Sequence, residues 1–309
     1  MGTFSLCVRA VAPLVVFMFL GCVLRWTGLV SEQGFADLRR LAVTVFIPFT
    51  NFQSIHKADF FAIFPGRAIL IGSLLAVGLF AAVSLAVPRL VGKGAAPTVV
   101  HGMMHPNMSV IGIPLARQLL GEEGLSEFVV LLSFLCIVFS ALMVANHQYY
   151  AGERRSILRL AADILKTPIL VGAALGMVFS LLPFRFPEIA EDLFSTFGGA
   201  CGPMCLIALG GSFSFAGMKW KPVALTCAVR LALVPAVVLA AAAAAGLSGE
   251  YVLLLMLIFA CPAALLCQMM SEQISGDPEL GAQIVVYTSV LCPFTIFGWL
   301  YVTLRLFGV

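Results

Sequence analysis

The stretches VVHGMMHPNMSVIG (99–112) and LMLIFACPAALLCQ (255–268) each place a proline in the middle of an apolar run. Proline lacks a main-chain N–H and clashes with the preceding turn, so it interrupts a helix. About ten residues precede Pro106 in its run, roughly 15 Å of helix and half of a ~30 Å hydrocarbon core. We therefore expect two membrane helices that break near the bilayer midplane, at Pro106 and at Pro262.

These breaks belong to a wider repeat. Three proline pairs recur at a separation of 155 or 156 residues: Pro13 with Pro168, Pro48 with Pro203, and Pro106 with Pro262. The pattern indicates two copies of one unit, at 1–150 and 166–309, joined by a cytosolic linker at 151–165.

The composition is that of a polytopic, all-α membrane protein. Of 309 residues 61% are apolar and 11% are charged, against about 25% charged in soluble domains. The small net charge of +3 predicts no nucleic-acid partner, and membrane lipids are the expected surroundings. Ten apolar runs are long enough to span a membrane: 4–24, 36–55, 66–87, 95–120, 124–148, 166–183, 189–215, 222–246, 250–275 and 280–306.

Five spans in each copy invert the second copy relative to the first, which is typical of secondary transporters. With the N-terminus outside, the inside loops hold eleven basic residues: Arg25, Arg39, Arg40, Arg89, Lys93, Arg154, Arg155, Arg159, Lys166, Lys219 and Lys221. The outside segments hold six: Arg9, Lys57, Arg67, Arg117, Arg185 and Arg305. This bias predicts both termini outside the cell membrane, the inner membrane in a bacterium.

The two breaks are the expected site. A broken helix leaves N–H groups without partners at one end, and these partly positive groups suit an anion such as a carboxylate. A kinked packing helix is the alternative for a single break. The symmetry-related pair instead favours two broken helices that cross and form a site between the repeats.

The residues around the first break resemble those of a known family. Asn107-Met108-Ser109-Val110-Ile111-Gly112-Ile113-Pro114-Leu115, followed by Gly121-Glu122-Glu123-Gly124-Leu125, is similar to the fourth-span signature of the auxin efflux carrier family. Ala228-Val229-Arg230-Leu231 is similar to the eighth span of the plant members, and Cys261-Pro262 with Gly276-Asp277-Pro278 resembles the ninth-span pattern of the bacterial members.

The resemblance implies a ten-helix fold like that of sodium/bile-acid symporters, with a scaffold domain and a crossover domain that move as an elevator. It also implies a small organic anion as substrate, auxin-like or malonate- or malate-like, and a homodimer. It carries over a substrate-binding set: Pro106, Asn107, Met108, Ser109, Pro262, Ala263 and Ala264. Two differences make auxin a doubtful substrate: Ala263 and Ala264 replace the Gln-Gly of the plant proteins, and the long cytosolic loop is absent.

Four further polar residues lie in the predicted spans. Arg230 either attracts a carboxylate, pairs with an acidic or carbonyl partner, or reaches the inner surface. His105, beside the break, either takes part in proton coupling or bonds a carbonyl at a helix end. Gln268 lines a vestibule or ends a helix in solvent, and ordinary interhelical hydrogen bonds account for Asn51.

We therefore expect a secondary transporter of small mono- or dicarboxylates that works by alternating access. The alternatives are a membrane receptor or sensor for carboxylates, a sodium-coupled organic-anion symporter and a channel. The few side-chain oxygens near the breaks favour sodium-independent transport. We predict no enzymatic activity and no cofactor. His101 and His105 have no acidic third ligand nearby in the sequence, and the nine cysteines form no CxxC pair, so we predict no metal site.

Overall fold

The computed structural model describes residues 3–56, 64–152, 168–182, 186–211 and 217–308, so the predicted linker lies outside it from residue 153 on. The described chain is helical, with one isolated β-bridge and no strand. The helices are α1 (Thr3–Trp26), α2 (Glu32–Leu41), η1 (Ala42–Phe46), α3 (Ile47–His56), α4 (Gly66–Val91), α5 (Ala96–Met104), η2 (Met108–Gly112), α6 (Ile113–Ala151), α8 (Pro168–Leu181), α9 (Glu188–Gly210), α10 (Trp220–Ala228), η3 (Val229–Leu233), α11 (Val234–Ala244), α12 (Gly249–Phe259), α13 (Leu266–Gln273) and α14 (Pro278–Phe307). The three η segments are single π-helical turns.

Six described helices are long and apolar enough to cross a membrane: Thr3–Trp26, Gly66–Val91, Gly124–Ala151, Glu188–Gly210, Trp220–Ala244 and Pro278–Phe307. They indicate a multi-pass membrane protein. The other four predicted spans contain shorter helices: α2, η1 and α3 in 36–55, α5 and η2 in 95–120, α8 in 166–183, and α12 and α13 in 250–275. The count of ten spans stays a prediction.

Local sequence fixes where two helices begin. Before α2, the Ser31 hydroxyl accepts a hydrogen bond from the Gly34 N–H at 3.1 Å. Before α14, the Asp277 carboxylate accepts one from the Leu280 N–H at 3.0 Å, and Pro278 occupies the first helical position. Both are common ways to satisfy the first N–H groups of a helix.

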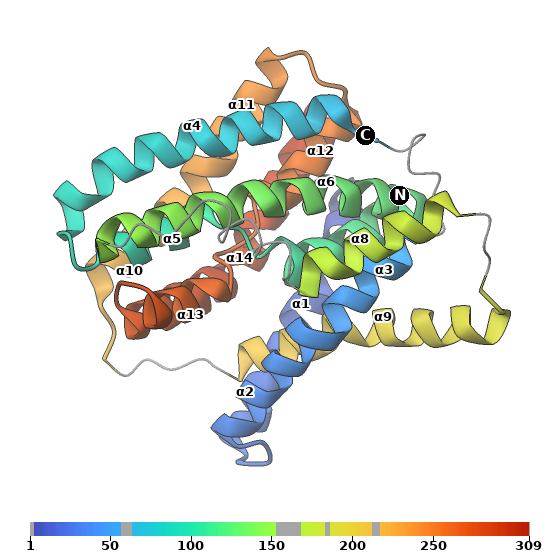
Figure 1. The fold of residues 1–309 in the computed structure, drawn as a ribbon, viewed down its shortest axis with the longest axis horizontal. Helices are drawn as coiled ribbons and strands as arrows, with labels where there is room; N and C mark the ends of the chain where they lie inside the picture. Colours follow the sequence, from blue (N-terminus) through green and yellow to red (C-terminus); the bar gives the residue numbers. More distant parts are fainter. Residues whose placement is uncertain (1–2, 57–63, 153–167, 183–185, 212–216, 309) are drawn as a thin grey trace.

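The helices form two groups. One contains α1, α2, α3, α8 and α9, and the other contains α4, α5, α6 and α10 to α14. Figure 1 shows α2 and α9 at the bottom and α4 and α11 at the top. The groups meet where α1 contacts α14 and where α3 contacts α6. Glycine permits close helix contacts in the first group, because a Cβ at Gly172 would overlap the Pro48 carbonyl and one at Gly210 would overlap the Met18 carbonyl.

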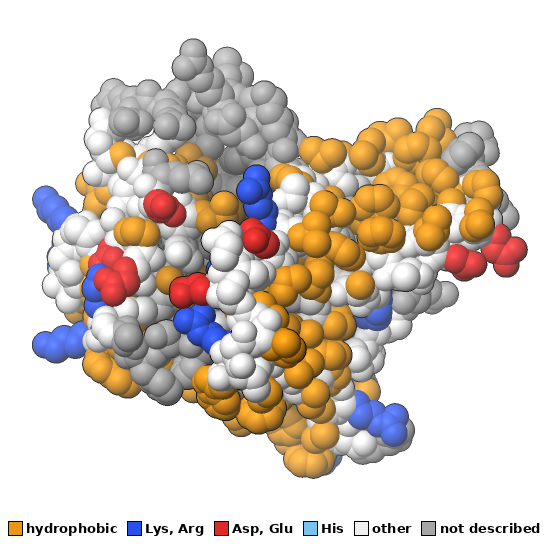
Figure 2. Space-filling view, turned by 90° about the horizontal axis from the view of Figure 1, so that it is seen from below, with side chains coloured by type: hydrophobic (Ala, Val, Ile, Leu, Met, Phe, Trp, Pro, Cys, Tyr) orange, Lys and Arg blue, Asp and Glu red, His pale blue; other side chains and the backbone are white. Residues whose placement is uncertain are grey.

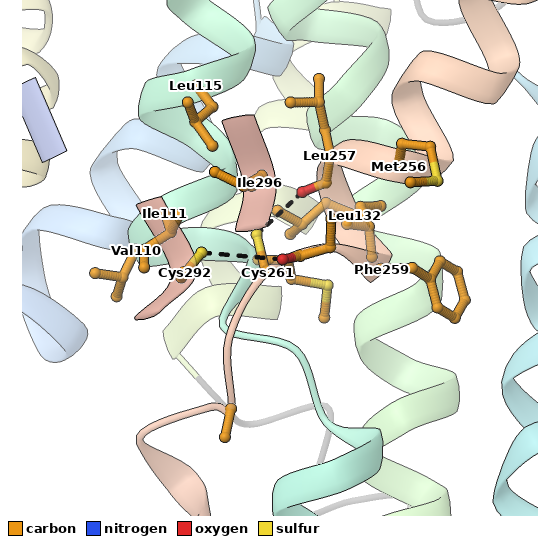
Figure 3. Close-up of a cluster of buried hydrophobic side chains, with 14 of the residues drawn as sticks. Val110, Ile111, Leu115, Leu132, Met256, Leu257, Phe259, Cys261, Cys292 and Ile296 are labelled. Carbon is orange, nitrogen blue, oxygen red and sulfur yellow. Dashed lines mark hydrogen bonds between the residues drawn. The ribbon is translucent and has the colours of Figure 1, made fainter. Parts of the chain in front are cut away.

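The second group supplies most residues of the buried core. Figure 3 shows side chains of η2, α6, α12 and α14 meeting there, with the Cys261 and Cys292 thiols directed at main-chain carbonyls. By contrast, α4 leaves Leu70, Leu74 and Leu85 more than 60% exposed. Figure 2 shows hydrophobic side chains in broad patches on one face of the molecule. Exposed apolar surface of this extent fits contact with lipid.

Candidate functional site at the crossing of two broken helices

The two proline breaks meet at the centre of the second group. They run antiparallel and share two main-chain hydrogen bonds. The Asn107 N–H donates to the Pro262 carbonyl at 2.7 Å, and the Ala264 N–H donates to the His105 carbonyl at 2.9 Å. Each break therefore supplies a partner for a main-chain group that the other broken helix leaves without one.

The prolines and Ala263 are part of this crossing. Pro106 and Ala263 form the isolated bridge, and Pro262 and Ala263 are buried. The Ala263 N–H donates to the Thr288 hydroxyl at 3.1 Å, which ties the second break to α14. These residues thus hold the crossing together, and Pro106 also lines the space beside it.

Arg230 joins the two helices that end at the crossing. The side chain is fully buried; its Nε donates to the Cys261 carbonyl at 2.8 Å and its Nη2 to the Phe259 carbonyl at 2.9 Å. Its Nη1 lies 3.2 and 3.3 Å from the Met103 and Met104 carbonyls. Phe259, Met103 and Met104 lie at the C-terminal ends of α12 and α5, and Cys261 follows α12 by two residues. No following turn supplies N–H groups there, and a cation faces the negative helix ends. Of the partners expected for Arg230, the structure therefore shows main-chain carbonyls.

A cavity of about 70 Å³ lies where η2 and α13 begin. Asn107 is 6% exposed there, and its Nδ2 forms no hydrogen bond with any described residue. An unpaired buried donor costs about 1–3 kcal/mol, so this amide suits an acceptor that enters the cavity. Six predicted site residues line the cavity: His105, Pro106, Asn107, Met108, Ser109 and Ala264.

A second cavity, of about 180 Å³, shares Ser109 with the first. It lies between the two groups of helices, because α1, α3 and α9 line it on one side and η2 and α6 on the other. Arg117 and Gln118 of α6 bring a positive charge and an amide to it. Among the described residues that line the two cavities, none is Asp or Glu.

Arg117 was expected in an outside segment and not at the site. The one sequence signal for it is its spacing, since Ser109 and Arg117 are eight residues apart and so share a helix face. The spacing alone does not predict a cavity, because the cavity forms only where α9 packs beside η2.

Two predicted residues lie away from this cavity pair. Gln268 is exposed and lines a cavity of about 120 Å³ with Arg25 and Glu32. On α13, Leu266 and Met269 face the crossing instead. Asn51 is fully buried in α3, whose contributions to the two cavities are Ile47 and Thr50.

Comparison with known proteins identifies the family of the chain. The sequence profile of a family described as membrane transport protein matches the chain twice, over residues 6–159 and 153–300. The chain is also similar to an uncharacterized transporter of Methanothermobacter thermautotrophicus, with 23% identity over 298 residues that cover 94% of this chain and 96% of the relative. The two profile matches together span almost the whole sequence. The chain therefore belongs to the membrane transport protein family, the family of the auxin efflux carriers.

Proposed function

We propose that the protein is a secondary transporter that moves small organic anions, mono- or dicarboxylates, by alternating access. The observation that carries this proposal is the buried Nδ2 of Asn107, which has no partner among the described residues and lies where two helices begin. A carboxylate oxygen would accept from this amide and face the positive ends of η2 and α13.

The charge and size of the cavities support a small anion. Arg117 lies in the larger cavity and no acidic side chain lines either one among the described residues. The volumes, about 70 and 180 Å³, are far below the ~300–1,000 Å³ of sites for drug-sized ligands. Malonate and malate are therefore better candidates than the larger, aromatic auxin.

The arrangement of the two groups of helices supports an elevator movement. The crossing belongs entirely to the second group, and the larger cavity lies between this group and the first. We propose that the second group carries the anion along the first, within an inverted repeat of ten spans. The repeated prolines and the double profile match support that repeat. Both termini outside and a homodimer complete the proposal.

Substitution of Asn107 tests the site. A hydrogen bond to a charged group contributes about 1.5–3 kcal/mol, so Asn107→Ala should weaken malonate binding roughly 12- to 150-fold. Binding is measured by isothermal titration of purified protein, with the neutral diamide of malonate as a ligand control. Ser133→Ala is the matched variant, because its hydroxyl donates within α6 to the Val129 carbonyl at 2.7 Å. Equal affinity in wild type and Asn107→Ala would exclude this amide from the site.

Flux assays separate a carrier from a receptor or a channel. In proteoliposomes a carrier should show saturable malonate counterflow, whereas a receptor would bind malonate without flux and a channel would not saturate. Replacement of sodium by choline should leave the flux unchanged, because among the described residues that line the smaller cavity only Asn107 and Ser109 carry side-chain oxygens. A strict sodium requirement would favour a symporter.

A further inference from the structure

Three buried histidines form a continuous hydrogen-bonded chain that starts at the crossing. His105 Nδ1 lies 3.1 Å from His101 Nε2, and His101 Nδ1 lies 2.9 Å from His147 Nε2. His147 Nδ1 lies 2.7 Å from the carbonyl of Ser275, and the Ser275 hydroxyl donates to the His147 carbonyl at 2.8 Å. All three rings are at most 3% exposed, whereas the turn continues to the exposed Gly276.

The carbonyl at one end fixes the protonation of every ring. A carbonyl only accepts, so His147 carries its proton on Nδ1 and, when neutral, offers a bare Nε2. His101 must then donate from Nδ1, which leaves its Nε2 bare to accept from His105 Nδ1. The remaining nitrogen, Nε2 of His105, is therefore a base, and His105 lines the smaller cavity.

This order permits proton transfer along the chain. A proton that binds Nε2 of His105 displaces the Nδ1 proton to His101, and His101 passes its own Nδ1 proton to His147. His101 and His105 end as neutral rings protonated on Nε2, and His147 ends as an imidazolium. The Ser275 carbonyl cannot take a proton, so His147 loses its Nδ1 proton when this hydrogen bond opens and water at the exposed turn accepts the proton. One proton enters at the cavity and one leaves at the turn.

The surrounding charges favour this direction. Arg230 of η3 bonds the carbonyl next to His105, so its charge repels a cation on that ring. His147 lies in the last turns of α6, where the negative end of the helix attracts a cation. In the described part of the chain no carboxylate bonds to any of the three rings. Among the described titratable groups nearby, Cys136 lines the smaller cavity with His105, and the Cys267 thiol and the Asp277 N–H donate to Thr98, three residues before His101.

We propose that His105, His101 and His147 form a proton relay between the anion cavity and the turn at Ser275. The chain would couple anion transport to proton movement, so the inference rests on the proposed function. A metal site is the competing use of three histidines. However, ring nitrogens 2.9 and 3.1 Å apart are hydrogen-bonded to each other, and the described residues hold no group arranged for a metal ion.

The first test needs no substrate. Nitrogen-15 NMR of histidine-labelled protein in lipid nanodiscs resolves the tautomers of all four histidines of the protein, three of which form the hydrogen-bonded chain. We expect Nδ1-protonated His101, His105 and His147 at alkaline pH. On acidification His147 should become the imidazolium while His101 and His105 change to the Nε2-protonated form. Fixed tautomers at all pH values, or an imidazolium that forms first on His105, would overturn the relay.

The second test uses malonate transport. His147→Gln should abolish malonate accumulation driven by a pH gradient, while malonate counterflow at equal pH remains. His56→Gln is the matched control, because His56 bonds to Glu191 away from the crossing. Accumulation retained in His147→Gln would overturn the relay. Wild-type protein that neither binds nor moves malonate would count against malonate as the substrate, and the NMR result would still decide the relay.

Discussion

Arg230→Met should lower the stability of the protein strongly, because in the described part of the chain Arg230 is the side chain that bonds the ends of both broken helices. Four carbonyls accept from the guanidinium. Hydrogen bonds to charged groups contribute about 1.5–3 kcal/mol each, which for four bonds is roughly 6–12 kcal/mol. Burial of the guanidinium, which has no carboxylate partner among the described residues, costs several kcal/mol and offsets part of this gain. We therefore expect Arg230→Met to lower the free energy of unfolding by about 3–5 kcal/mol.

The loss is measured as a shift in the thermal unfolding midpoint of protein purified in detergent. A shift of about 2–4 °C per kcal/mol in domains of 150–250 residues implies a fall on the order of 10 °C. Arg230→Lys should recover little, because a single ammonium cannot reproduce the planar fork that reaches both helix ends. Arg89→Met is the matched control, since Arg89 is exposed and bonds one carbonyl of its own helix.

Two results would refute this reasoning. If Arg230→Met unfolds at the wild-type temperature, the four hydrogen bonds do not hold the crossing together. If it keeps its stability but no longer binds malonate, Arg230 contacts the anion and the carbonyl bonds are secondary. Equal losses in Arg230→Met and Arg89→Met would point to a general effect of losing a cation.

Two other substitutions test the packing and the surface charges. Gly172→Val should separate α3 from α8 and lower the yield of folded protein, because its Cβ would overlap the Pro48 carbonyl; normal yield and thermal midpoint would contradict this close contact. Lys219 lies 2.6 Å from Asp277, and this hydrogen bond raises the pKa of Lys219. Burial raises the pKa of Asp277, but the hydrogen bonds from Lys219 and Leu280 outweigh it and leave the pKa below 3.8. The pair therefore stabilises the fold at pH values between the folded-state pKa of Asp277 and that of Lys219. It loses its effect as the pH falls through the first pKa or rises through the second. Lys219→Met should cost about 0–1 kcal/mol near pH 7, and this difference in thermal midpoint should vanish in acid; a constant difference down to pH 2 would contradict the assignment.

The crossing was largely predictable from the sequence, and its surroundings were not. Pro106 and Pro262 mark the breaks because proline has a local, context-independent effect on a helix. Arg117 and His147 lie against distant segments of the chain, and spacing along one helix does not reveal these contacts. Similarly, Arg230 could have faced the substrate, the surface or a carbonyl, and only the positions of α5 and α12 decide among these partners.

The bridge between the breaks has a consequence for how the protein is made. Each break depends on main-chain groups from the opposite half of the chain. During synthesis, the first half must enter the membrane while the N–H of Asn107 and the carbonyl of His105 lack these hydrogen-bond partners. Unsatisfied main-chain groups are costly in hydrocarbon, so this part of the nascent first half must be kept out of contact with lipid until the second half is inserted. Two separately expressed halves could supply the same bonds to each other, which makes the crossing a natural point of assembly for a split protein.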